Sequence, residues 1–115
     1  MRLERLKAVA LALPQTTVVK QWGENLVFKV AGKVFLLVSL DGELAEGITF
    51  KCTRDEFAAL TEIDGLGQAP YFAKRLWVAV SDLSALPAPE VERRIRHSYD
   101  LFVAGLPKKI RVALK

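Results

Sequence analysis

The chain contains 115 residues, of which 51% are hydrophobic and 26% are charged. This composition is typical of a globular domain and excludes a disordered or collagen-like chain. One Cys excludes an internal disulfide, and one Cys with one His excludes a zinc site built from such ligands within one chain. We expect a single domain over residues 1–115, in a reducing cytosol, with no metal and no cofactor.

The charge is unevenly distributed along the chain. The formal net charge is +4, from 17 Lys and Arg against 13 Asp and Glu. Residues 106–115 contain four bases and no acid, so the remaining 13 bases balance the 13 acids. Residues 41–64 hold seven acids against two bases, whereas residues 65–115 hold nine bases against four acids. These runs predict an electrically polarised molecule, which favours a charged partner.

The N-terminal segment resembles neither a targeting signal nor a membrane span. Charged residues recur throughout residues 1–7, which is unlike the apolar region of a signal peptide. The apolar stretch at residues 8–13 is far shorter than the roughly 20 residues that cross a bilayer. We therefore expect a soluble, cytoplasmic protein that does not associate with membranes.

The first half of the chain predicts one helix followed by four strands. Apolar residues recur at helical spacing over residues 2–13, and Pro14 ends this amphipathic helix. Alternating and β-branched residues predict strands at 16–22, 26–30, 33–40 and 48–52. The strand at 33–40 is apolar on both faces and is expected to be central, whereas 48–52 is half-polar and is expected at or near an edge.

The second half predicts a helix, a strand and a final helix. Thr53 followed three residues later by Glu56 is a capping box, which predicts a helix over residues 54–62. A glycine-containing loop follows at 64–72, and a strand is predicted at 74–81. The last helix begins near Pro89 and is capped by Gly105. The order α-β-β-β-β-α-β-α predicts a two-layer α+β fold, with a mostly antiparallel sheet of about five strands and helices on one face.

The apolar pattern also predicts how the sheet is covered. We expect Phe35 and Leu37 on the second sheet face, where a loop, the tail or another subunit must cover them. A monomer is favoured over a homodimer. The residues expected in one core are Val34, Leu36, Phe50, Val78, Ile95 and Phe102.

No set of residues predicts catalysis. Cys52 shares the apolar face of its strand with Ile48 and Phe50, so we interpret it as a buried hydrophobic residue and not a nucleophile. His97 falls on a polar helix face and is expected at the surface. Acids in a first helical turn, such as Glu56, are favoured there by the helix dipole. Because no nucleophile, base and orienting group can be combined, we predict no enzymatic activity.

Cations on the sheet indicate a surface for anions. Lys29 and Lys51 alternate with apolar residues and are expected on the solvent side of the sheet, with Lys33 at a strand start beside them. Such a cluster suits DNA phosphates, although lysines on edge strands also prevent sheet-to-sheet aggregation. Trp22, Tyr71 and Trp77 are candidates for stacking on bases or for core packing. The predicted DNA-contacting residues are Lys29, Lys33, Lys51, Lys74, Arg75, Lys108, Lys109 and Arg111.

Short segments along the chain together resemble the YjbR/MmcQ family of small bacterial proteins. They are Trp22-Gly23-Glu24, Phe28-Lys29-Val30, Gly32-Lys33-Val34-Phe35, Thr49-Phe50-Lys51-Cys52, Pro70-Tyr71, Lys74 with Trp77, Ser98-Tyr99 and Leu106-Pro107-Lys108-Lys109. The resemblance implies a fold similar to the type III secretion chaperones, with helices packed against a twisted antiparallel sheet. It also implies DNA binding, by analogy to a paired-wing arrangement of hairpins.

The residues and the resemblance together lead to one main hypothesis. We predict a small non-enzymatic binding module that contacts the DNA backbone weakly and nonspecifically, through the sheet lysines and the basic tail at 106–115. The tail itself is predicted either to add a strand or to stay mobile. The alternative is a protein-interaction or chaperone-like module without a nucleic-acid role, for which the acidic segment at 41–64 is the attractive surface.

Overall fold

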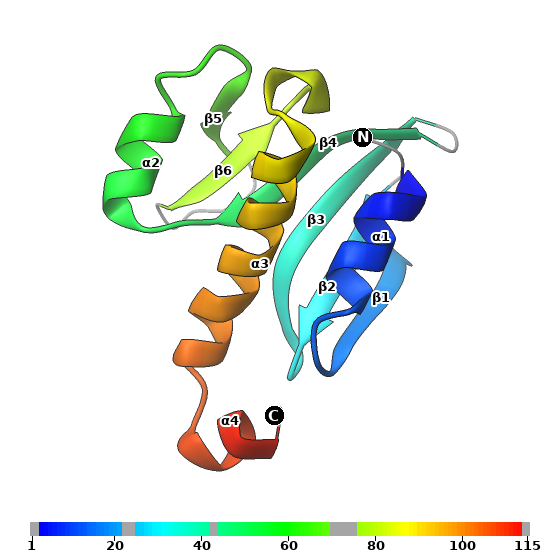
Figure 1. The fold of residues 1–115 in the computed structure, drawn as a ribbon, viewed down its shortest axis with the longest axis vertical. Helices are drawn as coiled ribbons and strands as arrows, with labels where there is room; N and C mark the ends of the chain where they lie inside the picture. Colours follow the sequence, from blue (N-terminus) through cyan, green and yellow to red (C-terminus); the bar gives the residue numbers. More distant parts are fainter. Residues whose placement is uncertain (1–2, 22–24, 42–43, 70–75, 114–115) are drawn as a thin grey trace.

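The computed structural model describes residues 3–21, 25–41, 44–69 and 76–113, and its fold is shown in Figure 1. A six-stranded sheet has the order β1-β2-β3-β4-β6-β5, and every neighbouring pair is antiparallel. The strands are β1 (Thr16–Gln21), β2 (Asn25–Val30), β3 (Lys33–Asp41), β4 (Leu44–Lys51), β5 (Leu66–Gln68) and β6 (Trp77–Val80). The helices are α1 (Leu3–Leu11), α2 (Arg54–Leu60), the 3-10 helix η1 (Leu83–Ala85), α3 (Ala88–Ala104) and α4 (Lys108–Ala113).

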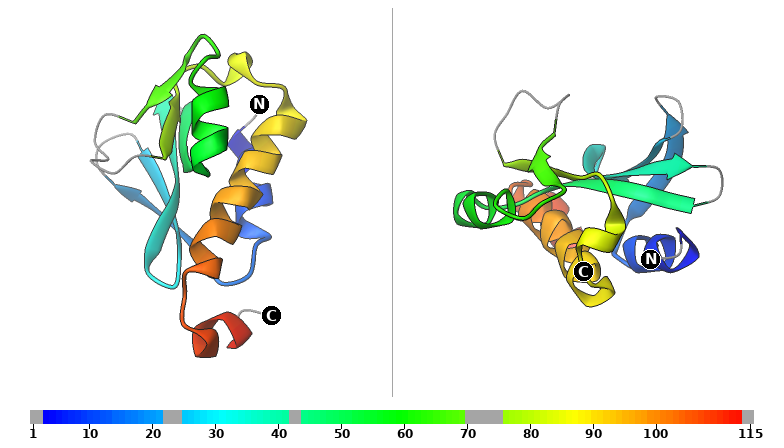
Figure 2. Two further views of the ribbon diagram at one scale, coloured as in Figure 1. Left: turned by 90° about the vertical axis from the view of Figure 1, so that its left-hand side faces the viewer. Right: turned by 90° about the horizontal axis from the view of Figure 1, so that it is seen from above.

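The helices confirm the predicted two-layer arrangement. Helices α1 and α3 lie side by side against one face of the sheet, and α2 flanks the end of the sheet that contains β6 (Figure 2). The sheet has one strand more than the five expected. The additional strand, β5, has three residues, which is too short for an alternating pattern to mark it in the sequence. No helix within the described ranges is both long and apolar enough to cross a membrane.

Local signals place the helix ends close to their predicted positions. The capping box at α2 is formed as predicted, with the Thr53 hydroxyl accepting from the Glu56 amide and the Glu56 carboxylate accepting from the Thr53 amide. Gly105 ends α3, also as predicted. Residues 108–113 of the tail form α4, which is neither the strand nor the mobile segment that we expected. The carbonyl of Pro107 accepts hydrogen bonds from the amides of Ile110 and Arg111 and so begins this helix.

The pairing of the strands brings apolar residues together on the sheet face that the helices cover, and these residues form the core. Phe28, Leu36, Phe50 and Val78 are paired across four neighbouring strands, and all four side chains are fully buried. Ile95 from α3 is fully buried in the same cluster. The remaining two residues of the predicted core are only half-buried: they are Val34 and Phe102.

Two expectations about the strands are wrong. β4, which contains residues 48–51 of the strand predicted at 48–52, is an interior strand because β3 and β6 pair with its two sides. Phe35 packs with the helices and not on the second face. A bulge between Phe28 and Lys29 of β2 leaves Phe35 as the unpaired residue of β3. Its ring then packs edge-on against Tyr99 of α3, with the ring centroids 5.4 Å apart.

Candidate functional site

Acidic residues gather at one end of the longest axis of the molecule, which extends 40 Å. This acidic end contains the last residues of β3, the first residues of β4, the segment after α2, and η1, all at the top of Figure 1. The segments 39–41, 44–47, 61–66 and 81–85 contain five acids and no base. The acids are Asp41, Glu46, Glu62, Asp64 and Asp82.

Basic residues gather at the opposite end. The turn between β2 and β3 and the helix α4 both lie at the bottom of Figure 1 and of the left view in Figure 2. The segments 27–36 and 100–113 contain five bases and a single acid, Asp100. We call this surface the basic end, and its bases are Lys29, Lys33, Lys108, Lys109 and Arg111.

The structure separates the predicted DNA-contacting residues into groups. Lys33, at the start of β3, is exposed. Lys29 lies near the end of the paired strand β2 and is half-buried. Lys51 lies apart from them at the end of β4, where its ammonium is 5.0 Å from the centroid of the Phe102 ring. Lys108, Lys109 and Arg111 are exposed on α4. Lys74 and Arg75 are outside the described residues.

Of the three aromatic residues predicted to stack on bases or pack in the core, the structure describes Trp77, and this side chain is packed inside the protein. Trp77 is 6% exposed, and its ring lies 5.7 Å from that of Phe102. A side chain so enclosed does not offer a face on which a base could stack. The other two aromatic candidates, Trp22 and Tyr71, lie outside the described residues.

Glu56 organises a polar contact between α2 and α3. Its carboxylate lies 2.8 Å from Nε2 of His97, and Arg94 donates to its second oxygen. Arg94 also donates to Glu90 at 2.8 Å. Burial by itself would raise the pKa of Glu56, but hydrogen bonds with Thr53 and Arg94 and the charge of His97 outweigh it and lower the pKa to about 2. His97 is therefore half-buried in an ion-pair network and not a plain surface residue as expected.

Cys52 beside this network has the properties of a core residue. Its side chain is 1% exposed. Burial, and secondarily the negative charge of Glu56, raises the pKa of the Cys52 thiol to about 11. A nucleophilic cysteine requires a lowered pKa, so this environment disfavours thiolate chemistry. Among the described residues, no cluster of three or more His, Cys, Asp or Glu side chains is arranged to hold a metal ion.

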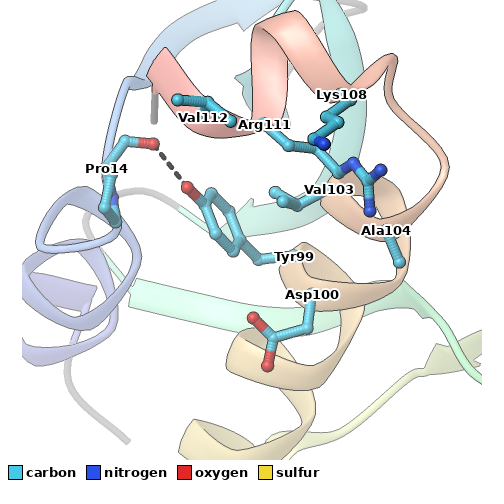
Figure 3. Close-up of a pocket in the computed structure, with 8 residues that line it drawn as sticks. All are labelled: Pro14, Tyr99, Asp100, Val103, Ala104, Lys108, Arg111 and Val112. Carbon is cyan, nitrogen blue, oxygen red and sulfur yellow. Dashed lines mark hydrogen bonds between the residues drawn. The ribbon is translucent and has the colours of Figure 1, made fainter. Parts of the chain in front are cut away.

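A cavity of about 560 Å³ lies where α3, α4 and the α1–β1 connection meet (Figure 3). Sequence reasoning missed it because α4, which forms one wall, was not predicted as a helix. Charged side chains from α3 and α4 stand at its margin. The residues that line the cavity are Pro14, Tyr99, Asp100, Val103, Ala104, Lys108, Arg111 and Val112.

Comparisons with known proteins agree with the fold described above. The family model described as YjbR matches residues 11–101. The structure resembles a crystal structure of a Deinococcus radiodurans protein with a DUF419 domain, with a TM-score of 0.85 and 23% identity, covering 98% of this chain and 87% of that chain. It also resembles a Pseudomonas syringae protein, with a TM-score of 0.69 and 21% identity, covering 88% of this chain and 98% of that chain. A comparison with curated protein sequences found no match.

Proposed function

The chain belongs to the YjbR family, and from this premise we propose that it is a small DNA-binding module that contacts phosphates with its basic end. The observation that carries the proposal is the separation of charge along the 40 Å axis. Five bases and one acid lie at the basic end, whereas the acidic end has five acids and no base. A phosphate backbone is attracted to such a surface whatever its base sequence.

Charge separation explains how a nearly neutral body can still attract DNA. At physiological ionic strength, charges in water are screened over a distance of about 8 Å. The acidic end lies several such lengths away from the basic end, along an axis of 40 Å. A phosphate that approaches Lys33 or Lys108 therefore experiences the local positive charge and little of the distant negative charge.

The number of cations at the basic end sets the expected strength of binding. Three to five phosphate contacts correspond to a log–log salt slope of about −2.7 to −4.5 on duplex DNA, at about −0.9 for each phosphate. Affinity is then micromolar or weaker at physiological salt, as is common for nonspecific binders. Lys51 is peripheral to this set because its ammonium is held over the ring of Phe102.

Fluorescence anisotropy with a labelled duplex of arbitrary sequence, at several salt concentrations, tests this proposal. The double charge reversal Lys29→Glu/Lys33→Glu should weaken binding at least about tenfold at low salt and reduce the slope by about 2. The matched control is Arg54→Glu/Arg93→Glu, which makes the same change in net charge at exposed positions outside the basic end. It should change affinity by less than about threefold.

Two results would overturn the proposal. Equal losses in the two double variants would mean that only net charge matters. Absence of binding at low salt would mean that the protein has no DNA surface, and the protein-interaction alternative would take its place. Capture of partners from a lysate, with and without nuclease, distinguishes these cases, because protein partners persist after nuclease treatment.

A further inference from the structure

The cavity between α3 and α4 has the form of a small-molecule site. Its volume of about 560 Å³ lies within the range of roughly 300–1,000 Å³ found for ligand pockets. Pro14, Val103, Ala104 and Val112 form an apolar wall together with the ring of Tyr99 (Figure 3). Apolar pockets with a few polar groups at fixed positions are the usual arrangement for binding small ligands.

Tyr99 is held in place before any ligand enters. Its hydroxyl donates a 2.7 Å hydrogen bond to the carbonyl oxygen of Pro14, drawn as a dashed line in Figure 3. Its ring also packs edge-on against Phe35 in the core. Because the hydroxyl is already paired, Tyr99 contributes mainly its apolar ring to the cavity. The wall is therefore preformed, which reduces the entropy lost on binding.

The charges at the margin of the cavity favour an anion. Lys108 and Arg111 are three residues apart on α4 and so lie on the same face of the helix. None of the ion pairs between described residues includes either of them. Asp100 also lines the cavity, but Figure 3 shows its carboxylate directed away from both cations. Two unpaired cations beside an apolar wall are complementary to a ligand with one anionic group and an apolar body.

We propose that this cavity binds a small amphipathic organic anion, a carboxylate or a phosphate monoester carried on an apolar body. The anionic group pairs with Lys108 and Arg111, and the body packs against Tyr99, Val103 and Val112. This site shares Lys108 and Arg111 with the proposed DNA contact but differs from it in what it requires. It requires the cavity and two particular cations, whereas the DNA contact requires the summed charge of the basic end.

A pair of fluorescent probes tests the site in the intact protein. The anionic probe is 8-anilinonaphthalene-1-sulfonate, and the neutral probe is N-phenyl-1-naphthylamine, which lacks only the sulfonate. The anionic probe should bind saturably at one site, and about tenfold more tightly than the neutral probe, a ratio that corresponds to about 1.4 kcal/mol. Decanoate and decyl phosphate should each displace the anionic probe, whereas decanol should not. Comparing the two anions shows whether the site accepts a carboxylate, a phosphate or both.

Matched variants locate the binding. Lys108→Gln and Arg111→Gln should each weaken the anionic probe about tenfold, the equivalent of about 1.4 kcal/mol. The control Lys109→Gln makes the same change of charge on the same helix, but Lys109 does not line the cavity. It should leave probe affinity within about twofold. Ala104→Phe places a ring in the cavity and should block both probes while thermal unfolding shows a folded protein.

The outcomes separate this proposal from DNA binding. Equal affinity for the two probes, equal losses in Lys108→Gln and Lys109→Gln, or full binding by Ala104→Phe would each overturn it. DNA binding should respond alike to Lys108→Gln and Lys109→Gln, because phosphate contact depends on summed charge. The failure of one proposal therefore leaves the other standing.

Discussion

The hydroxyl of Ser98 in α3 donates a hydrogen bond of 2.6 Å to the carbonyl oxygen of Phe35 in β3. The same hydroxyl accepts a hydrogen bond of 3.0 Å from the backbone amide of Lys51 in β4. In the register of these two strands, Phe35 and Lys51 would form the next pair after Leu36 and Phe50. The hydroxyl thus takes the place of a direct bond between the strands and fixes α3 to the sheet.

Replacement of Ser98 should be destabilising although only one oxygen atom is removed. Ser98 is fully buried. Ser98→Ala leaves one amide and one carbonyl without a partner, and each unsatisfied buried group costs about 1–3 kcal/mol. We expect a loss of about 2–4 kcal/mol in the free energy of unfolding, measured by urea denaturation. The control Ser81→Ala removes an exposed hydroxyl that bonds to Gly65 and should cost less than about 1 kcal/mol. Equal losses would show that the Ser98 bridge is not important for stability.

Gly47 should not tolerate a side chain. A β-carbon at this position would lie 2.2 Å from the carbonyl oxygen of Val80, which belongs to the backbone of β6. Gly47→Ala should therefore force the two strands apart and cost about 1–3 kcal/mol or more. Gly67 on β5 is the control, since a β-carbon there meets no atom within 4 Å. Gly67→Ala should be neutral or slightly stabilising in the same unfolding measurement, and similar losses in both variants would contradict the close approach at Gly47.

Stability should depend on the ionisation of Glu56. Its pKa is about 2 in the folded protein, against 4.5 for an ordinary glutamate. A carboxyl with a lowered pKa stabilises the folded state above its unfolded pKa, and this contribution is lost as the pH falls through the folded pKa. The free energy of unfolding should therefore decrease between about pH 4.5 and pH 2, and Glu56 should supply about 1–3 kcal/mol of that decrease after allowance for its partial exposure.

The variant Glu56→Gln isolates this contribution. It removes the ion pairs with Arg94 and His97 and should flatten part of the acid limb of the stability curve. Glu62→Gln changes an exposed glutamate just beyond α2 and should leave the curve nearly unchanged. An acid limb of the same steepness in Glu56→Gln and in the unaltered protein would show that Glu56 does not carry the pH dependence.

Cys52 should be slow to react while the protein is folded. With a pKa of about 11, the thiol is almost entirely protonated at neutral pH, and its side chain is 1% exposed. Iodoacetamide reacts with thiolate, so labelling at about pH 8 should be at least a hundredfold slower in the folded protein than in guanidinium chloride. Mass spectrometry of the time course measures both rates. Equal rates would indicate an accessible thiol and would reopen the question of a chemical role for Cys52.

Much of the fold follows from local patterns in the chain. The capping box at Thr53 and Glu56, the helix end at Gly105 and the apolar run of β3 depend on neighbouring residues, so they can be identified without a structure. The alternation in the strand at 48–52 likewise assigns Phe50 to the core, where it is fully buried. These signals act over a few residues, since helix caps and strand alternation are local consequences of backbone geometry.

The candidate sites depend on residues that are distant in sequence. The basic end combines the β2–β3 turn with α4, and the cavity joins Pro14 to Tyr99 and Arg111. The displacement of Phe35 toward the helices depends on a bulge that alternation does not reveal. Only tertiary packing decides which distant segments meet. It also decides where a side chain replaces a backbone hydrogen bond, as the Ser98 hydroxyl does between β3 and β4. Charge pattern could therefore indicate a polarised molecule, but tertiary structure was required to place the opposite charges at the two ends of an axis that extends 40 Å.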